Sequence, residues 1–242
     1  MMMPAARAEQ ATKVYGMGDT SVTALDRVDL ELERGKLTSI MGPSGSGKST
    51  LMHCLAGLDR LTSGRVFIGD TDLASLSDEQ LTRLRRDRVG FIFQAFNLIP
   101  TLTAGENISL PARIARASLE PDWQAQVIDV LGLGDRLDHR PSELSGGQQQ
   151  RVAAARALVR RPDIVFADEP SGNLDTSSAA ELLGFLRRAV DEFGQTIVMV
   201  THDPSAAAYS DRIVFLRDGT PVSEMFEPTV EGIFDHLKTL EA

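Results

Sequence analysis

The sequence predicts an α/β fold built on a mostly parallel sheet, and three observations support this prediction. Strand-like and helix-like segments alternate along the 242 residues. Residues 37–41, 163–167 and 196–200 are short, mostly apolar segments followed by polar or glycine-containing turns, as expected of strands buried on both faces. Residues 22–25 and 28–32 alternate apolar and polar side chains, which favours an N-terminal antiparallel sheet with one face in water.

The middle of the chain is predicted to be mostly helical. Residues 89–93 predict one more strand, and from about residue 98 to residue 144 helical signals replace strand signals. Thr103 and Glu106 have the spacing of a capping box, and Pro121 suits the first turn of a helix. Ahead of this region a run of four arginines, residues 83–88, predicts a solvated helix face. We therefore expect a helical subdomain inserted into the α/β core.

The last third of the chain predicts a hairpin and a closing helix. Asp218-Gly219 separates two strand-like segments, 212–217 and 220–223, and tolerates the positive φ angles of a tight turn at a sheet edge. Ile233, Leu237 and Leu240 have helical spacing, which predicts a short helix that packs on a neighbour. We expect one domain over residues 1–242, with a core at about 1–97 and 156–228, a helical subdomain at about 98–155 and a short tail at 229–242.

Composition limits the class of protein. The 25 Lys and Arg against 34 Asp and Glu leave a net charge of −9 and a pI near 5.0, which argues against nucleic acid as a partner. The single cysteine, Cys54, excludes an internal disulfide, fits a reducing compartment and is expected to be buried. The start has no signal-peptide pattern, and no window approaches the ~18 apolar residues of a membrane helix. We expect a cytoplasmic protein that does not span a membrane.

A glycine-rich loop follows the predicted strand 37–41. Residues 42–49 fit the pattern G-x-x-x-x-G-K-[ST] and precede a helical segment, as the phosphate-binding P-loop requires. The glycines let backbone N–H groups surround phosphates, Lys48 reaches the β- and γ-phosphates, and the Ser49 hydroxyl can ligate Mg²⁺. An ordinary Gly/Ser loop would not account for Lys48 in a turn between a strand and a helix.

Two carboxylates follow the predicted strand 163–167. Asp168 and Glu169 stand where ligands of open α/β sheets collect. Mg²⁺ bound by Asp168, with Glu169 polarising a water in line with the γ-phosphate, would account for both residues. An acidic turn that caps the next element is the alternative, and the P-loop makes it the poorer one.

Residues 144–151, Leu-Ser-Gly-Gly-Gln-Gln-Gln-Arg, allow two interpretations. Ser145 and Gln148 form a capping box for a helix at 146–160, which is locally sufficient. It leaves Gly146-Gly147 in the first turn unexplained, because glycine costs ~1 kcal/mol relative to alanine in a helix. Bare backbone at a helix N-terminus binds anions, so the chain offers a second phosphate-binding surface.

Together these motifs, with Gln94, Asp175 and His202, resemble the nucleotide-binding subunit of an ATP-binding cassette transporter over roughly residues 14–223. The resemblance implies a P-loop NTPase core with a mostly parallel sheet, an N-terminal antiparallel β-subdomain and an inserted helical subdomain. It also implies that two copies meet head to tail around two MgATP, so that each signature motif closes on the ATP held by the other copy's P-loop.

The resemblance implies a role for each matching residue. Glu169, His202 and Gln94 would be catalytic, with His202 at the γ-phosphate and Gln94 at the attacking water. Mg²⁺ would be held by Ser49, Gln94 and Asp168. The ATP site would comprise Tyr15, stacked on adenine, and the loop residues Gly42, Pro43, Ser44, Gly45, Ser46, Gly47, Lys48, Ser49 and Thr50. The partner copy would contribute Ser145, Gly146, Gly147, Gln148 and Asp175. Locally, Tyr15 also fits a half-buried strand position and Asp175 a helix N-cap.

Residues 93–107 and 170–175 look like the branch that includes lipoprotein-release, macrolide-export and cell-division-associated ATPases. The resemblance implies an ATPase that drives an integral membrane permease from the inner face of the cell membrane, for export, lipoprotein release or mechanotransmission. An ATPase of this class that acts on nucleic acid or ribosomes is the alternative. Its members carry long insertions or two cassettes, whereas the 97 positions from Lys48 to Ser145 contain no long coiled coil. A small-molecule kinase would leave residues 144–148 and His202 without a role.

Overall fold

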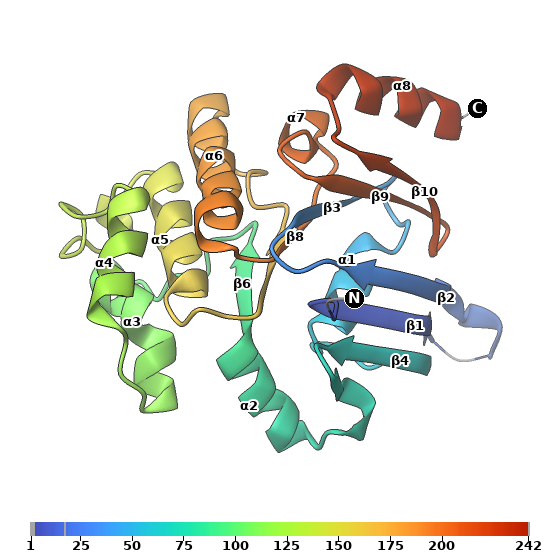
Figure 1. Cartoon of the computed structure of the whole chain (residues 1–242), viewed down its shortest axis with the longest axis horizontal. Helices are drawn as coiled ribbons and strands as arrows, with labels where there is room; N and C mark the ends of the chain where they lie inside the picture. The colour runs from blue at the N-terminus through green and yellow to red at the C-terminus, as the bar shows by residue number, and fades with distance from the viewer. Residues whose placement is uncertain (1–2, 17, 242) are drawn as a thin grey trace.

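The strands form two sheets in the computed structural model, which describes residues 3–16 and 18–241 (Figure 1). Among these residues the larger sheet has six strands in the order β10-β9-β3-β8-β7-β6, and the smaller has four in the order β2-β1-β4-β5. The strand bounds are β1 Ala6–Tyr15, β2 Val22–Leu32, β3 Leu37–Met41, β4 Ser63–Ile68, β5 Thr71–Asp72, β6 Val89–Phe93, β7 Ile164–Asp168, β8 Ile197–Val200, β9 Arg212–Arg217 and β10 Thr220–Phe226.

The large sheet confirms the predicted mostly parallel arrangement. Strands β9, β3, β8, β7 and β6 are parallel, and only β10 pairs antiparallel, at the edge. The predicted hairpin is therefore present, with Asp218 at φ 50° and Gly219 at φ 77° in its turn. The parallel strands bring their carboxyl ends to one edge of the sheet, where Asp168 lies opposite Phe93 and Val200.

The small sheet differs in detail from its prediction. Residues 22–25 and 28–32 belong to one continuous strand, β2, which pairs antiparallel with β1 through a shifted register. The irregularity coincides with Arg27, whose φ is 48°, so a local kink replaces the expected break between two strands. Residues 28–32 alternate buried and exposed side chains as predicted, whereas of residues 22–25 only Leu25 is buried.

The described chain has helices α1 to α8 and three 3₁₀ turns, η1 to η3. Their bounds are η1 Gly18–Thr20, α1 Lys48–Leu55, η2 Leu73–Ser75, α2 Asp78–Arg88, α3 Ala104–Ala115, α4 Pro121–Val130, η3 Pro141–Glu143, α5 Gly146–Leu158, α6 Thr176–Phe193, α7 Pro204–Ala207 and α8 Val230–Glu241. The capping box predicted at Thr103 starts α3, and Pro121 opens α4. Helix α5 runs past residue 155, the expected end of the helical subdomain. In the described part of the chain no helix has the length and apolarity to cross a membrane.

Two hydrophobic cores lie on the two faces of the large sheet. Along β7, Ile164 and Phe166 face the first core, whereas Val165 and Ala167 face the second. The first core joins the large sheet to α1 and the small sheet, and the second joins it to helices α3 to α6 (Figure 1). The helical region therefore shares its core with the sheet that carries the predicted site. Cys54 is buried in the first core, as predicted.

The prediction of a solvated arginine face is right for Arg83 and wrong for Arg88. Arg83 pairs with Glu79 one turn away on the surface of α2. Arg88 instead donates to the Asp163 carboxylate, the Thr71 hydroxyl and the Ile68 carbonyl, so it ties the end of α2 to both sheets. The C-terminal helix α8 packs on its own chain, where Ile233 is buried against β9.

Candidate active site

The glycine-rich loop connects β3 to α1 in a conformation that only glycine can adopt at two positions. Gly42 has φ 151° and Gly47 φ 98°. A Cβ atom would lie 2.1 Å from the Leu216 carbonyl oxygen at Gly42 and 2.4 Å from the Ala24 carbonyl oxygen at Gly47. Gly47 is also the N-cap of α1 and offers no side-chain acceptor, so the first amides of this helix point into the loop without a cap.

The loop contains a cation and a buried hydroxyl that has no hydrogen-bond partner in the described part of the chain. The Ser46 hydroxyl is buried and has no hydrogen-bond partner among the described residues. The Lys48 ammonium donates to the carbonyl oxygens of Gly42 and Pro43, both at 2.9 Å, and so folds back over the loop. Burial lowers the pKa of Lys48, while the charges of Glu169 and Asp168 oppose this shift. A cation and unpaired donors around a backbone concavity fit a phosphate chain.

Asp168 and Ser49 face each other across the loop. The Ser49 hydroxyl lies 3.5 Å from Asp168 Oδ1, so two oxygen ligands converge beside the phosphate-binding concavity. Burial raises the pKa of the Asp168 carboxyl, and the neighbouring Glu169 adds to the rise. A hydroxyl and a carboxylate are the hard oxygen donors that Mg²⁺ takes, usually together with substrate phosphate oxygens and water. These residues therefore fit the ion.

Glu169 is held in an unusual backbone conformation at the end of β7. Its φ is 45°, and its N–H donates to the Val200 carbonyl on the neighbouring strand at 2.9 Å. One carboxylate oxygen lies 2.7 Å from His202 Nδ1, and the other accepts from the Thr201 hydroxyl at 3.5 Å. The fold thus brings Glu169 and His202 together from two adjacent strand ends.

Gln94 follows β6, the neighbour of β7 on its other side. Its side-chain amide donates to Asn173 Oδ1 at 3.4 Å, and the Asn173 amide donates to the Gln94 carbonyl at 3.0 Å. A Cβ at Gly172 would lie 2.9 Å from Gln94 Nε2. Gln94 is therefore packed against the turn that follows Glu169. The sequence analysis did not single out Asn173, although it lies between Pro170 and Asp175 in a quoted motif.

Tyr15 lies at the end of β1, with 42% of its surface exposed. Its hydroxyl donates to Asp59 at 2.7 Å, and this bond raises the pKa of the phenol. Lys13 binds the same carboxylate at 2.6 Å and stands 4.8 Å from the centre of the Tyr15 ring. An exposed ring beside the loop's helix is available for stacking. Asp59, which orients this ring, was missed by the sequence analysis.

Ser145 and Asp175 each cap a helix, and the two helix starts adjoin. Ser145 Oγ accepts from the Gln148 N–H at 3.2 Å, in the predicted capping box of α5. Asp175 accepts from the Ser178 N–H at 3.0 Å and caps α6. A Cβ at Gly147 would lie 2.6 Å from Ser178 Oγ, whereas one at Gly146 would meet only the Phe96 ring at 3.6 Å. Close helix packing therefore accounts for Gly147 but not for Gly146.

The predicted residues thus fall into two groups. The loop 42–50, Asp168, Glu169 and His202 form one group, with Gln94 at its margin. Ser145, Gly146, Gly147, Gln148 and Asp175 form the other. Within the described residues no hydrogen bond or ion pair joins the second group to the loop.

Comparison with known proteins shows the family of the chain. Residues 25–172 match the family described as ABC transporter. The chain belongs to the ABC transporter family. It is 45% identical over 217 residues to an ABC transporter ATP-binding protein, MJ0796, of Methanocaldococcus jannaschii, covering 87% of this chain and 92% of that protein. The ATPase fold and class predicted from the motifs are therefore confirmed.

Other relatives carry export functions in their names. The chain is 45% identical to the macrolide export ATP-binding/permease protein MacB of Hyphomonas neptunium over 93% of its own length, which is 35% of that protein. It is 44% identical to the bacitracin export ATP-binding protein BceA of Halalkalibacterium halodurans, over 86% of this chain and 83% of that protein. These relatives bear out the predicted branch. The chain spans about a third of the length of the MacB proteins it matches.

A solved structure gives the same fold. The dimeric structure of a post-hydrolysis state of the ATP-binding cassette MJ0796, bound to ADP and phosphate, superposes with a TM-score of 0.82 at 40% identity, covering 93% of this chain and 99% of that one. That neighbour was solved as a dimer with hydrolysis products.

Proposed function

We propose that this ABC cassette hydrolyses ATP as a head-to-tail pair and drives an integral membrane permease of the export branch. The observation that carries the proposal is the separation of its phosphate-binding features into two groups on different helices. One group is the loop ahead of α1, and the other is the first turn of α5. One chain alone leaves each group half complete, and a second copy turned head to tail completes both. The dimeric structures of MJ0796 support this arrangement.

In this proposal the loop residues Gly42, Pro43, Ser44, Gly45, Ser46, Gly47, Lys48, Ser49 and Thr50 hold the triphosphate, and Tyr15 stacks on adenine. The Lys48 ammonium exchanges its two carbonyl acceptors for phosphate oxygens. Ser49 and Asp168, with Gln94, would hold Mg²⁺, which would neutralise charge on the phosphates. The unpartnered Ser46 hydroxyl acquires an acceptor in the same step.

Glu169 is the base that takes a proton from the attacking water. Its carboxylate is oriented by the Thr201 hydroxyl and by His202 Nδ1. A ring nitrogen that donates to a carboxylate leaves the other nitrogen free to face substrate. Gln94 orients the water from the neighbouring strand end. The Glu169 carboxylate also lies near enough to Lys48 in the loop for its charge to oppose the fall in the pKa of Lys48.

The second copy contributes the first turn of α5. Ser145 Oγ already accepts from the Gln148 N–H, so the amides ahead of it, at Gly146 and Gly147, are directed at the incoming phosphate. Asp175 communicates across the same interface. We propose the boundaries given above for one ATPase domain with a helical subdomain, whose α5 end carries this surface.

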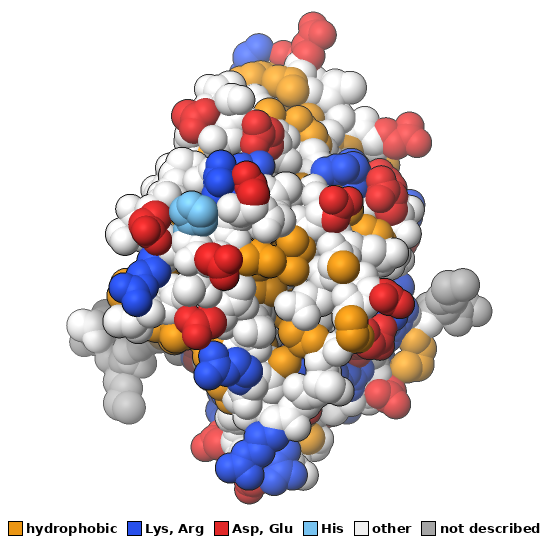
Figure 2. All heavy atoms as spheres, turned by 90° about the vertical axis from the view of Figure 1, so that its left-hand side faces the viewer, with side chains coloured by type: hydrophobic (Ala, Val, Ile, Leu, Met, Phe, Trp, Pro, Cys, Tyr) orange, Lys and Arg blue, Asp and Glu red, His pale blue; other side chains and the backbone are white. Residues whose placement is uncertain are grey.

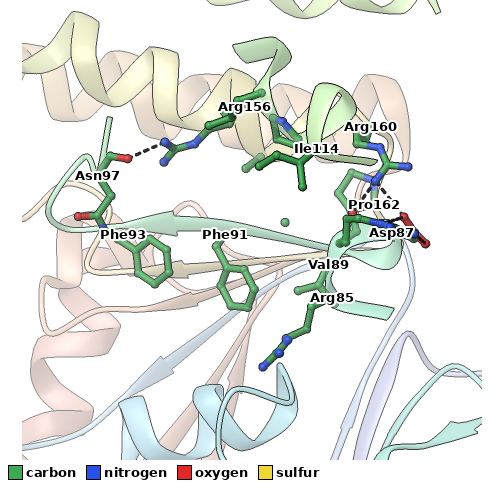
Figure 3. A pocket seen from close by; sticks show the side chains of 15 residues that line it. Arg85, Asp87, Val89, Phe91, Phe93, Asn97, Ile114, Arg156, Arg160 and Pro162 are labelled. Atoms are coloured by element: carbon green, nitrogen blue, oxygen red, sulfur yellow. Dashed lines mark hydrogen bonds and ion pairs between the residues drawn. The ribbon is translucent and has the colours of Figure 1, made fainter. Parts of the chain in front are cut away.

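The permease binds in a groove between the sheet and the helical region. The groove has a volume of about 410 Å³ and lies beside the loop that follows Gln94 (Figure 3). Phe91 and Phe93 line one wall, Ile114 and Arg156 the other. Ile114 is 66% exposed, so its apolar side chain is available to a partner. A short permease helix with an apolar face fits this groove, and it would hold the cassette at the inner face of the membrane.

The distribution of charge on the neighbouring surface is typical of a surface that binds a protein. Figure 2, viewed from the side of α3 and α4, shows apolar side chains near the middle of that face, surrounded by charges of both signs. A nucleic-acid surface would instead gather positive charge on one face.

Complementation between damaged chains tests the paired site. Lys48→Ala and Ser145→Arg homodimers should both be inactive, because every composite site carries one lesion. In a mixed dimer both lesions fall in one site, and the other site is intact. ATPase activity should therefore return when the two purified variants are mixed with the permease present. If Ser145 only caps α5, Ser145→Arg loses roughly 1 kcal/mol of stability and hydrolyses ATP on its own. An active Ser145→Arg homodimer would refute the paired arrangement.

A further inference from the structure

Gln150 is a fully buried amide that touches both strand ends of the proposed catalytic site. It lies on α5, and its Nε2 donates to the Phe93 carbonyl at 3.0 Å and to the Pro170 carbonyl at 2.6 Å. Phe93 is the residue before Gln94, and Pro170 is the residue after Glu169. A single side chain therefore joins the backbone beside the two residues that are proposed to hold the attacking water.

The backbone itself provides no such connection. The ladder between β6 and β7 ends at the pair Phe93 and Asp168, and beyond it side chains join the two segments, Asn173 at the Gln94 carbonyl and Gln150 at the carbonyls of Phe93 and Pro170. Glu169 then turns through its left-handed conformation. Without the Gln150 amide, the carbonyls of Phe93 and Pro170 would lose a buried donor at the point where the strands separate.

A space-filling role does not account for an amide at this position. Gln150 Oε1 is buried and has no partner, which costs free energy that a methionine of similar size would not incur. Both carbonyls require a donor, so Nε2 is the atom that faces them. The two N–H groups are the feature that a methionine would lack.

The same helix holds the loop on the far side of Gln94. Arg156 donates to the carbonyl oxygens of Asn97 at 2.6 Å and Phe96 at 3.1 Å (Figure 3). One turn and a half before Gln150, the helix begins at the Ser145 cap. Helix α5 therefore connects the turn proposed to meet the partner's ATP with the backbone on both sides of Gln94.

From these contacts we infer that Gln150 is a positioning residue for ATP hydrolysis, which sets the separation of Gln94 and Glu169 when α5 engages the partner's nucleotide. The inference rests on the proposed function. Gln150 does not touch the loop that holds ATP, so it acts on turnover and leaves nucleotide binding unchanged. A displacement of about 1 Å between reacting groups can reduce a rate about 100-fold.

The test compares Gln150→Met with Val152→Ala in the full chain. Val152 is a fully buried residue of α5 whose apolar side chain has no donor for the strand-end carbonyls, so its truncation reports destabilisation without the loss of a hydrogen bond. Gln150→Met should lower kcat, normalised to folded protein, by about tenfold or more, with the KM for ATP and the affinity for ATP within twofold of wild type. Val152→Ala should lower the melting temperature and keep the wild-type kcat.

Four outcomes would count against the inference or against the proposed function. Wild-type kcat in folded Gln150→Met would overturn the inference, as would a parallel loss of kcat and ATP affinity. If Gln150→Met does not fold, Gln150→Asn keeps the amide but is one methylene too short to reach both carbonyls. It should then show a reduced kcat at unchanged KM, and a wild-type kcat there would also overturn the inference. Absence of ATPase activity in the wild-type chain with its permease would contradict the proposed function instead.

Discussion

Glu169 combines a backbone that non-glycine residues seldom adopt with two side-chain partners from one neighbouring strand end. Its φ of 45° would cost free energy in isolation, and the Val200 carbonyl, which accepts the Glu169 N–H, helps to hold it. Such strain is kept where it aims a side chain. The Glu169 carboxylate lies near enough to Lys48 and Asp168 for its charge to act on the pKa values of both.

Replacing the carboxylate should separate binding from turnover. Glu169→Gln keeps the size and the hydrogen bond from the Thr201 hydroxyl but cannot accept a proton from water. We expect unchanged ATP affinity and a loss of kcat of roughly 10²–10⁴-fold, measured as phosphate release beside equilibrium ATP binding. Glu79→Gln, an exposed helix glutamate, is the control and should keep both. Turnover at the wild-type rate in Glu169→Gln would remove Glu169 from the catalytic role.

Asp211 gives the fold an acid-sensitive contact away from the site. Its Oδ2 accepts from the Leu37 N–H at 2.8 Å and from Arg187 at 3.0 Å. Burial alone would raise the pKa of Asp211, but these donors and the charges of Arg187 and Lys36 hold it below its usual value. A carboxyl whose pKa is lower in the folded state stabilises the protein above its unfolded pKa. That contribution disappears as the pH falls through the folded pKa.

Asp211→Asn should therefore destabilise the protein at neutral pH and less so in acid. We expect a loss of about 1–3 kcal/mol in the free energy of unfolding at pH 7. The difference from wild type should shrink below the ordinary carboxyl pKa of about 3.9. Denaturant unfolding at pH 7 and pH 3 measures both, with exposed Asp138→Asn as the control. A difference that does not change with pH would contradict this assignment.

At the scale of elements, the first turn of α5 shows that two adjacent positions can be glycine for different reasons. Gly147 is required within one chain, because a Cβ would lie 2.6 Å from the Ser178 hydroxyl and 2.8 Å from its Cβ on α6. Gly146 faces only the edge of the Phe96 ring and is not required by packing. Its bare amide matters only if a second chain brings a phosphate to it.

Alanine at each position should distinguish a packing requirement within the chain from a role at the interface between chains. Gly146→Ala should keep or raise the melting temperature, since alanine favours the helix by about 0.5–1 kcal/mol, yet weaken ATP-dependent dimerisation. Gly147→Ala should lower the melting temperature because α5 and α6 must move apart. Thermal unfolding and light scattering with and without MgATP, in a Glu169→Gln background that retains ATP, measure both. Normal dimerisation of Gly146→Ala would exclude its amide from the interface.

At the scale of the whole molecule, the proposed nucleotide site and the proposed partner groove lie on different parts of the large sheet. Its carboxyl edge carries the residues proposed to face the phosphates, while the helical region on one face holds both the α5 turn and the groove beside β6. These parts share one hydrophobic core, so a partner in the groove packs against elements that lead directly to Gln94. This layout suits a subunit that exchanges force with a membrane protein.

A charge placed in the groove should uncouple the permease without affecting nucleotide binding. Ile114→Glu should abolish most permease-stimulated ATPase activity and co-purification with the permease, because burying an unpaired carboxylate is costly. ATP affinity of the isolated chain should not change. Phe226→Glu is the matched control, since Phe226 is 64% exposed, similar to Ile114, but lies on the edge strand β10. Equal loss in both variants would argue against the groove.

The sequence by itself determined the elements whose signals are local. Strand β6 coincides with its prediction and β7 and β8 lie within one residue of theirs, because these segments are almost continuously apolar and, in β7 and β8, both faces are buried. The capping boxes at Thr103 and Ser145 likewise coincide with helix starts, because a cap is decided within four residues. The P-loop could be predicted for the same reason, because its motif consists of contiguous residues.

Only the tertiary structure decided which distant residues meet. Gln150 donates to carbonyls 57 and 20 positions away in the sequence. Gly147 packs against Ser178, and Arg88 pairs with Asp163. Each contact depends on how parallel strands and the helices that cover them are ordered in space. A residue's spacing from its near neighbours carries no information about that order, so the positioning role of Gln150 became visible only when β6, β7 and α5 were placed side by side.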